Sequence, residues 1–159
     1  MSGRAATLST SADPVIRSPE GPEHEAFINL VLTATTLVQE VADTVKPRGL
    51  TEPQFNALRI LRGAGKDGLP CSGVAERMIT RVPDITRLVD RLERMGFAER
   101  RRDLTADRRV VKVAISPQGR ALLRKLDTPV RDLHREQFNH LSRAQLRDLT
   151  RLLKKLRAR

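Results

Sequence analysis

The chain has 159 residues, enough for one domain with a hydrophobic core, and its 30 Lys and Arg against 19 Asp and Glu give a formal net charge of +11. It contains no apolar run of the length that crosses a membrane, no apolar segment typical of a secretory signal near its start, and no second cysteine beside Cys71. These absences exclude a membrane-spanning protein and an intrachain disulfide framework, and they lead us to expect a cytoplasmic protein.

The first predicted helix follows a tail. Residues 1–22 are rich in Ser, Thr, Ala, Pro and Gly without apolar periodicity, so we expect them to be flexible. From Glu23 onward, apolar residues at alternating steps of four and three predict a helix that ends near Lys46, before Pro47 and Gly49. This apolar seam packs either inside its own subunit or against a second chain. Its members are Phe27, Val31, Ala34, Val38, Val41 and Val45.

A second helix is predicted from its start signals. Thr51 is the expected N-cap, Pro53 lies in the first turn, and Gln54 completes a capping box. The helix is expected to stop before Gly63. Its predicted buried face contains Phe55, Leu58 and Leu61.

Two short helices come next, after a turn at residues 66–68 and a very short strand at Leu69. The first is predicted over residues 71–78, and small Ala75 suits a close helix crossing. Its inward-facing residues are expected to be Val74, Ala75 and Met78.

The second short helix opens at Pro83 and ends at Gly96, where a left-handed residue is expected. A tight turn at 79–82 separates the two helices, so the pair predicts a helix-turn-helix. Its two faces differ in chemistry. The apolar face contains Ile85, Leu88, Val89, Leu92 and Met95, and the polar face contains Asp84, Arg87, Arg91 and Arg94.

A β-hairpin is predicted from strands at 97–102 and 110–115, with an arginine-rich tip at 103–109. An arginine-faced helix followed at once by an arginine-tipped hairpin suits a polyanion with adjacent grooves. Duplex DNA fits better than a single strand, because only four Phe and no Trp or Tyr are available to stack on bases. The charge alone also allows an anionic membrane surface, and arginine-rich composition also follows from a GC-rich genome.

Two long helices complete the chain. Ser116 caps the first, which is expected to run to about His140 with a distortion at Pro129. Ser142 and Gln145 form a second capping box that opens the last helix. The basic face of that helix is either a solvated surface or a DNA contact. The two apolar stripes contain Leu122, Leu126, Val130 and Leu133, then Leu146, Leu149, Leu152, Leu153 and Leu156.

This order of elements resembles the MarR family of bacterial transcriptional regulators. The similarity is carried by residues 85–93 running into 96–100, by Asp107-Arg108-Arg109, by residues 111–120 and by residues 51–58, and it extends over about 27–156. The resemblance implies a mainly α (α+β) fold in a single domain, residues 23–159. In it, a winged helix-turn-helix at 51–116 is joined to dimerisation helices at 23–50 and 117–159.

The resemblance also implies a function: a homodimer that binds a pseudo-palindromic operator in double-stranded DNA, as a repressor released by a small-molecule effector. The effector pocket of the family lies between the dimerisation helices and the winged domain, where this sequence is mostly aliphatic. Ligand-independent architectural DNA binding and redox regulation through Cys71 are the alternatives. No enzyme, cofactor or metal motif is present, and the only histidines, His24, His134 and His140, lack metal-binding spacing.

The implied major-groove contacts come from the second short helix. Thr86, Arg87 and Arg91 point towards the bases, and Arg87 is expected to make a bidentate contact with guanine. Asp84 either accepts a hydrogen bond from a cytosine amino group or stabilises the start of the helix.

The implied minor-groove contacts come from the hairpin tip. Asp107 would orient Arg109 into a narrow minor groove, and Arg108 would contact phosphate or a neighbouring carboxylate. The remaining phosphate candidates are Ser72, Arg81, Arg101 and Arg102.

Overall fold

The computed structural model describes residues 21–102 and 111–158, and the chain divides into two compact units, residues 1–36 and 37–159. Helix α1 (Pro22–Val45) runs through this division, so its residues 22–36 belong to the first unit and the rest to the second. A single 3₁₀ turn, η1 (Lys46–Arg48), follows and ends at Gly49, whose φ of 76° is left-handed. The predicted end near Lys46 is therefore confirmed, whereas most of the predicted tail lies outside the described residues.

Helix α2 (Glu52–Gly63) begins as its sequence predicts. The Gln54 amide donates to Thr51 Oγ1 at 3.4 Å, and the Thr51 amide donates to Gln54 Oε1 at 3.0 Å, so the capping box is complete. Gly63 is the last helical residue instead of the first one outside. The predicted inner face is buried and comprises Phe55, Leu58 and Leu61.

Helix α3 (Cys71–Ala75) is shorter than predicted, and its inner face differs. The backbone tightens after one turn, because the amides of Arg77 and Met78 donate to carbonyls three residues back. Within this short helix Gly73 and Val74 are buried, whereas Ala75 is exposed. The prediction that Ala75 faces the core was wrong.

Helix α4 (Ile85–Arg94) begins two residues later than predicted. Its N-cap is Asp84, whose side chain accepts from the Arg87 amide, so Pro83 lies before the cap and does not open the helix. At the other end, Gly96 has a φ of 74°, which confirms the predicted left-handed position after the helix.

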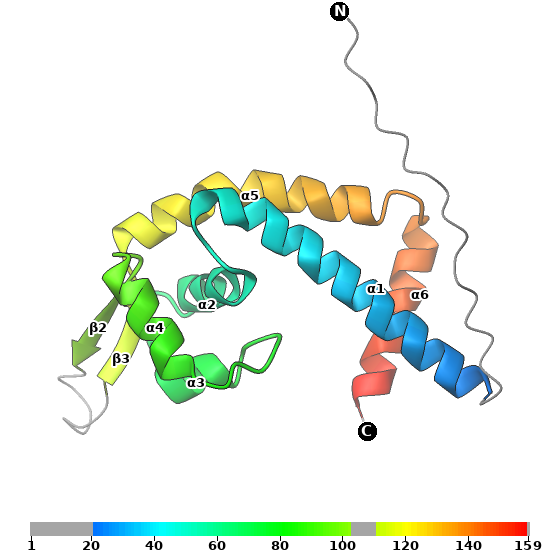
Figure 1. The fold of residues 1–159 in the computed structure, drawn as a ribbon, viewed down its shortest axis with the longest axis horizontal. Coiled ribbons are helices and arrows are strands. Elements are labelled where there is room, and N and C mark those ends of the chain that lie inside the picture. The colour runs from blue at the N-terminus through cyan, green and yellow to red at the C-terminus, as the bar shows by residue number, and fades with distance from the viewer. Residues whose placement is uncertain (1–20, 103–110, 159) are drawn as a thin grey trace, which may run out of the picture. The chain divides into compact units, whose positions relative to one another are not determined.

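The strands form a three-stranded antiparallel sheet. Strands β1 (Leu69–Pro70), β2 (Ala98–Arg102) and β3 (Val111–Ile115) are ordered β1-β3-β2, so β2 is an edge strand. Strands β2 and β3 lie beside α4 (Figure 1). Ser116 Oγ donates to the Gly96 carbonyl at 2.6 Å and thereby ties the end of the hairpin to the end of α4. The predicted hairpin strands and the short first strand are confirmed.

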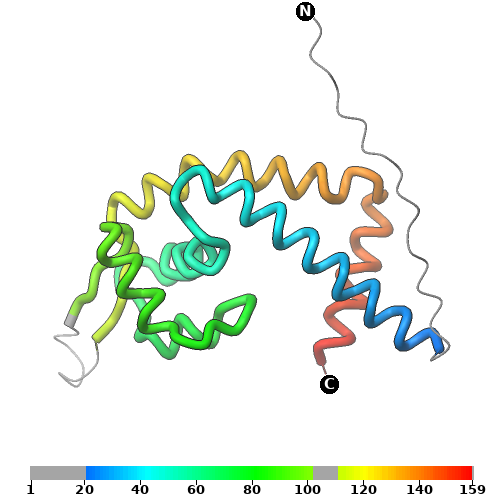
Figure 2. The backbone as a smooth tube through the Cα atoms, in the orientation of Figure 1, coloured from blue at the N-terminus to red at the C-terminus, as the bar shows by residue number. Residues whose placement is uncertain are grey.

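Helix α5 (Pro117–Gln137) is capped by Ser116, and α6 (Arg143–Arg157) opens with the predicted capping box of Ser142 and Gln145. The chain bends between them at residues 138–142, so α5 ends earlier than the predicted His140 (Figure 2). Pro129 lies inside α5, as predicted. The most deeply buried position of α5 is Leu123, which the predicted stripe had omitted in favour of its half-buried neighbour Leu122.

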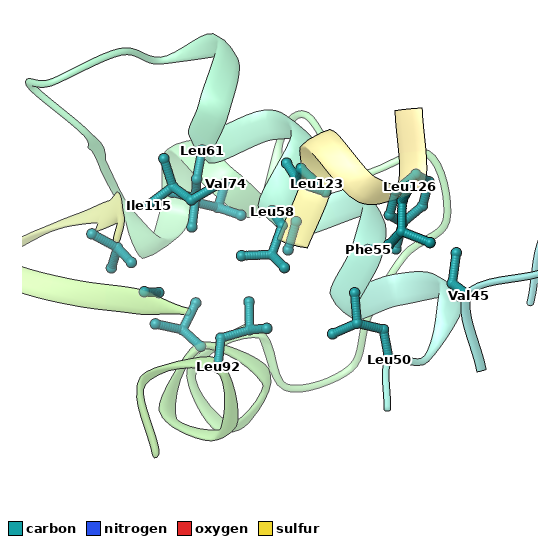
Figure 3. Close-up of a cluster of buried hydrophobic side chains, with 14 of the residues drawn as sticks. Val45, Leu50, Phe55, Leu58, Leu61, Val74, Leu92, Ile115, Leu123 and Leu126 are labelled. Carbon is teal, nitrogen blue, oxygen red and sulfur yellow. The ribbon is translucent and has the colours of Figure 1, made fainter. Parts of the chain in front are cut away.

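The hydrophobic core lies where α2, α4, the sheet and α5 converge (Figure 3). Each of its fully buried leucines contributes about 1.5–3 kcal/mol of burial free energy. Because the apolar side of α4 is fixed in this core, its polar side must face outwards. The fully buried leucines are Leu58, Leu61, Leu92, Leu123 and Leu126.

Candidate nucleic-acid interface

The outer face of α4 is a cationic surface. Arg87, Arg91 and Arg94 are exposed at helical spacing, and Thr86 lies beside them. The opposite face is anchored by buried residues of the core, including Leu92. The amphipathic pattern predicted from the sequence therefore holds, and the arginine face is free to meet a partner. We call this set, Thr86, Arg87, Arg91 and Arg94, the α4 arginine face.

Asp84 fixes the start of this helix. Its Oδ1 accepts from the Arg87 amide at 2.9 Å, which satisfies one of the amides that a helix leaves unpaired in its first turn. Of the two roles that the sequence left open for Asp84, the structure shows the stabilisation of the helix start. A contact with a cytosine amino group remains a prediction.

A second feature of α4 was not predicted: two of its carboxylates are paired with one arginine of the sheet. Arg100, on β2, bonds through Nη2 to Asp90 and through Nη1 to Glu93 (Figure 1 shows α4 beside β2). The hydrogen bond with Asp90 raises the pKa of the Arg100 guanidinium above its usual range, so the group stays charged. We call Arg100, Asp90 and Glu93 the wing latch.

The other predicted contact residues are spread over neighbouring segments. Ser72, on α3, and Arg81, in the connection between α3 and α4, are exposed. Arg101 pairs with Glu99 of its own strand. The structure therefore brings Thr86, Arg87 and Arg91 together on one helix, with Arg81 shortly before it in the chain. The three predicted residues of the hairpin tip, Asp107, Arg108 and Arg109, lie outside the described residues.

A cavity of about 540 Å³ lies between α2, α5 and α6. Its wall contains four arginines and two of the chain's four phenylalanines. The spacing of these residues in the sequence could have predicted this wall. Phe55, Arg59 and Arg62 share one face of α2, and His134 and Phe138 lie one turn apart on α5 and just after it. The lining residues are Phe55, Arg59, Arg62, Asp127, Val130, Arg131, His134, Arg135, Phe138 and Leu146.

An ion pair crosses one end of this cavity. Arg62 Nη1 of α2 donates to both oxygens of Asp127 on α5, at 2.8 and 2.9 Å. Arg59 lies over the Phe55 ring, with its guanidinium carbon 5.7 Å from the ring centroid. The cavity therefore combines aromatic rings with cationic groups: Asp127 in the wall pairs with Arg62, and Asp132 pairs with Arg131 and Arg135.

A smaller cavity of about 210 Å³ shares Phe55, Arg59, His134 and Phe138 with the first and extends to α1. Glu52 lines it, and partial burial raises the pKa of that carboxyl, with a hydrogen bond to Asn56 opposing the shift.

Cys71 is a partly buried free thiol that packs against the core. Within residues 21–102 and 111–158, no group of three metal-binding side chains comes together. In the same part of the chain, no helix has both the length and the apolar character needed to cross a membrane.

Comparison with known proteins decides what this arrangement is. The MarR family model matches residues 50–111, which run from just before α2 to the first residue of β3. A MarR transcription factor from Planctomyces limnophilus is 35% identical, with 85% of this chain and 97% of that chain covered and a TM-score of 0.65. The chain belongs to the MarR family. It is therefore a DNA-binding transcriptional regulator and not an enzyme.

Two further proteins are similar to this chain, one in sequence and one in fold. The HTH-type transcriptional regulator YsmB of Bacillus subtilis (strain 168) is 26% identical over 136 residues, which is 84% of this chain and 91% of YsmB. BpsR of Bordetella bronchiseptica, whose DNA binding is regulated by 6-hydroxynicotinic acid, shares the fold with a TM-score of 0.77. BpsR is 23% identical, with 89% of this chain and 99% of that chain covered. The MarR assignment identifies the helix-turn-helix as α3 and α4 and the wing as the three-stranded sheet.

Proposed function

We propose that this MarR-family protein is a cytoplasmic repressor that binds a pseudo-palindromic operator as a homodimer and is released from it by a small-molecule effector. The observation that carries the proposal is the α4 arginine face, which is exposed while the apolar face of the same helix is buried in the core. A rigid helix with this face fits the width of the DNA major groove, and the adjacent wing then meets the backbone or the minor groove.

Each residue of the interface has a proposed role. Arg87 makes a bidentate contact with guanine, because its planar fork matches the two acceptors of that base in the major groove. Thr86 and Arg91 contact neighbouring base edges or phosphates from the same exposed face. Asp84 acts mainly by holding the first turn of α4, where it positions the Arg87 backbone.

The flanking residues are proposed to position the protein on the backbone. In the wing, Asp107 orients Arg109 into the minor groove, and Arg108 contacts phosphate. Ser72 and Arg81, both exposed, contact phosphates beside the major groove.

The homodimer is supported by apolar side chains that the chain leaves uncovered. On α1, Phe27 is 60% exposed, and on α6, Leu152 is 53% exposed. Large apolar side chains left exposed on a helix are typical of a binding interface. We propose that a second copy of the chain covers it, with residues 23–50 and 117–159 forming the dimerisation part and 51–116 the DNA-binding part. The exposed apolar residues of these two helices are Phe27, Leu30, Val31, Leu32, Val38, Leu149, Leu152 and Leu156.

An effector site is supported by the larger cavity. Its volume suits a small organic molecule, and its phenylalanines and arginines suit a flat ring that carries a negative charge. An acidic ligand there would compete with Asp127 for Arg62, and the Arg62–Asp127 pair joins α2 of the winged part to α5. Effector binding would thereby change the position of one part relative to the other. This cavity favours ligand-responsive regulation over ligand-independent architectural binding.

The proposal is tested by selecting bound sequences from a pool of random duplex DNA and by measuring the mass of the protein in solution by sedimentation. We expect an inverted repeat whose half-sites are centred about 10–10.5 base pairs apart, or a multiple of that spacing, and we expect twice the mass of the chain. A selected motif without two-fold symmetry would contradict the proposed homodimer. So would a protein that sediments as a monomer at the concentrations at which it binds the selected DNA.

A further inference from the structure

The wing latch joins the recognition helix to the wing through both side chains and backbone. Arg100 bridges two carboxylates that lie three residues apart on α4, so one side chain is held at two points. In addition, its backbone amide donates to Glu93 Oε1 at 3.3 Å. Arg100 on β2 therefore bonds to two residues of α4, Glu93 and Asp90, which lie 7 and 10 residues earlier in the chain.

The backbone contact has a structural consequence, because β2 is an edge strand. Arg100 is paired with Val113 of β3 in the ladder, and on the other side of β2 its amide would otherwise face water or another chain. Glu93 covers that amide and so closes the strand edge with a side chain of the recognition helix. The wing is thereby fastened to α4 at its base.

We infer that Arg100 is a positioning residue for DNA recognition: it sets the placement of the wing relative to the α4 arginine face without itself contacting DNA. The inference rests on the proposed function for its effect on operator binding. One observation and one physical requirement support it. The guanidinium is only partly exposed and is committed to two carboxylates, whereas Arg87 and Arg91 are exposed and the structure shows no carboxylate paired with either of them among the described residues. A simultaneous contact of helix and wing with adjacent grooves requires their relative placement to be fixed.

Two other roles for Arg100 would give different salt dependences. If Arg100 contacted phosphate, its removal would flatten the dependence of log Kobs on log[salt] by about 0.9 per contact. If it only neutralised Asp90 and Glu93, its removal would weaken binding at low salt and have little effect at high salt, where charges are screened. A positioning role predicts a loss of affinity that is the same at every salt concentration.

The test compares wild type with Arg100→Gln and Arg100→Lys, and with Arg124→Gln, which removes the same charge from an exposed position of α5. Operator affinity is measured by anisotropy over a range of salt concentrations. We expect Arg100→Gln to lower affinity by about fivefold with an unchanged salt slope, as for the loss of a partly exposed charge network. Arg100→Lys, which can pair with one carboxylate at a time, should fall between it and wild type, and Arg124→Gln should match wild type.

Amide hydrogen exchange on the DNA-free protein gives a readout that does not depend on DNA. Peptides that cover β2 should exchange faster in Arg100→Gln than in wild type, while α2 and α5 keep their protection. Unchanged exchange in β2, or a flattened salt slope, would overturn the inference. If wild type selects no operator while β2 still loosens in Arg100→Gln, the proposed function fails and the latch itself stands.

Discussion

Replacing Asp84 separates its capping role from a role in base recognition. Asp84→Ala removes the one side-chain acceptor that the structure shows at the start of α4, the 2.9 Å bond from the Arg87 amide. Loss of an N-cap of this kind costs about 0.5–2 kcal/mol, typically about 1 kcal/mol. For a domain of this size, that loss lowers Tm by about 2–4 °C. Asp84→Ser keeps an acceptor at the cap and should stay within a few tenths of a kcal/mol of wild type, as known cap preferences indicate.

The assay is thermal unfolding at one fixed protein concentration, because dimerisation makes Tm concentration-dependent, together with operator titrations of both variants. We expect Asp84→Ala to lose both stability and affinity, and Asp84→Ser to retain most of each. If Asp84→Ala is as stable as wild type, the capping argument is refuted. If Asp84→Ser keeps its stability but loses discrimination at one base pair, Asp84 reads a base as well.

Three further predictions follow from glycine packing, burial and wing charge. A Cβ at Gly119 would lie 2.3 Å from the Phe97 carbonyl oxygen, so Gly119→Ala should cost about 1–3 kcal/mol in denaturant unfolding, as overpacking does. The control is Gly63→Ala, where a Cβ meets nothing within 4 Å; an equal loss in both would contradict the packing argument. The pKa of the Glu52 carboxyl is raised in the folded protein, so the folded protein binds this proton more tightly than the unfolded chain. The free energy of unfolding of wild type should therefore fall relative to that of Glu52→Gln as pH rises above about 4.5. The difference should become constant above the raised pKa. If the difference in unfolding free energy between the two proteins does not vary with pH, burial does not raise the pKa of the Glu52 carboxyl. In the wing, Arg109→Ala should weaken operator binding and flatten the salt slope by about one unit per protomer; unchanged affinity and slope in a salt titration would remove Arg109 from the interface.

Local signals in the sequence predicted the elements that local interactions determine. The capping boxes at Thr51 and Ser142 and the left-handed Gly96 each depend on residues within one turn, and the structure contains all three. The arginine face of α4 followed from helical periodicity, because the spacing of its residues around the helix is set within ten residues.

The errors occurred where tertiary packing decides the outcome. Ala75 was predicted to face the core, but the packing of α3 buries Gly73 and Val74 and leaves Ala75 exposed. In α5, the periodic pattern admitted either Leu122 or Leu123, and only the position of α5 against the core selects Leu123.

The features that the sequence did not predict are formed by side chains from different secondary-structure elements. The wing latch joins a helix to a strand, so no single periodicity contains it. The charged and aromatic wall of the cavity arises because one face of α2 meets one face of α5 far along the chain. The family resemblance located the DNA-binding elements, but these side-chain arrangements belong to this chain and needed its structure.

The central claim is that Arg87 on α4 reads sequence and does not simply add charge. It is tested most directly by titrating the selected operator and an unrelated duplex with wild type and Arg87→Ala at one salt concentration. We predict that the variant loses about 1–3 kcal/mol of discrimination at one base pair in each half-site, so that affinity for the operator falls far more than affinity for the unrelated duplex. An equal loss on both duplexes would mean that Arg87 contacts only phosphate, and an unchanged affinity for both would contradict the account of α4 as the recognition helix.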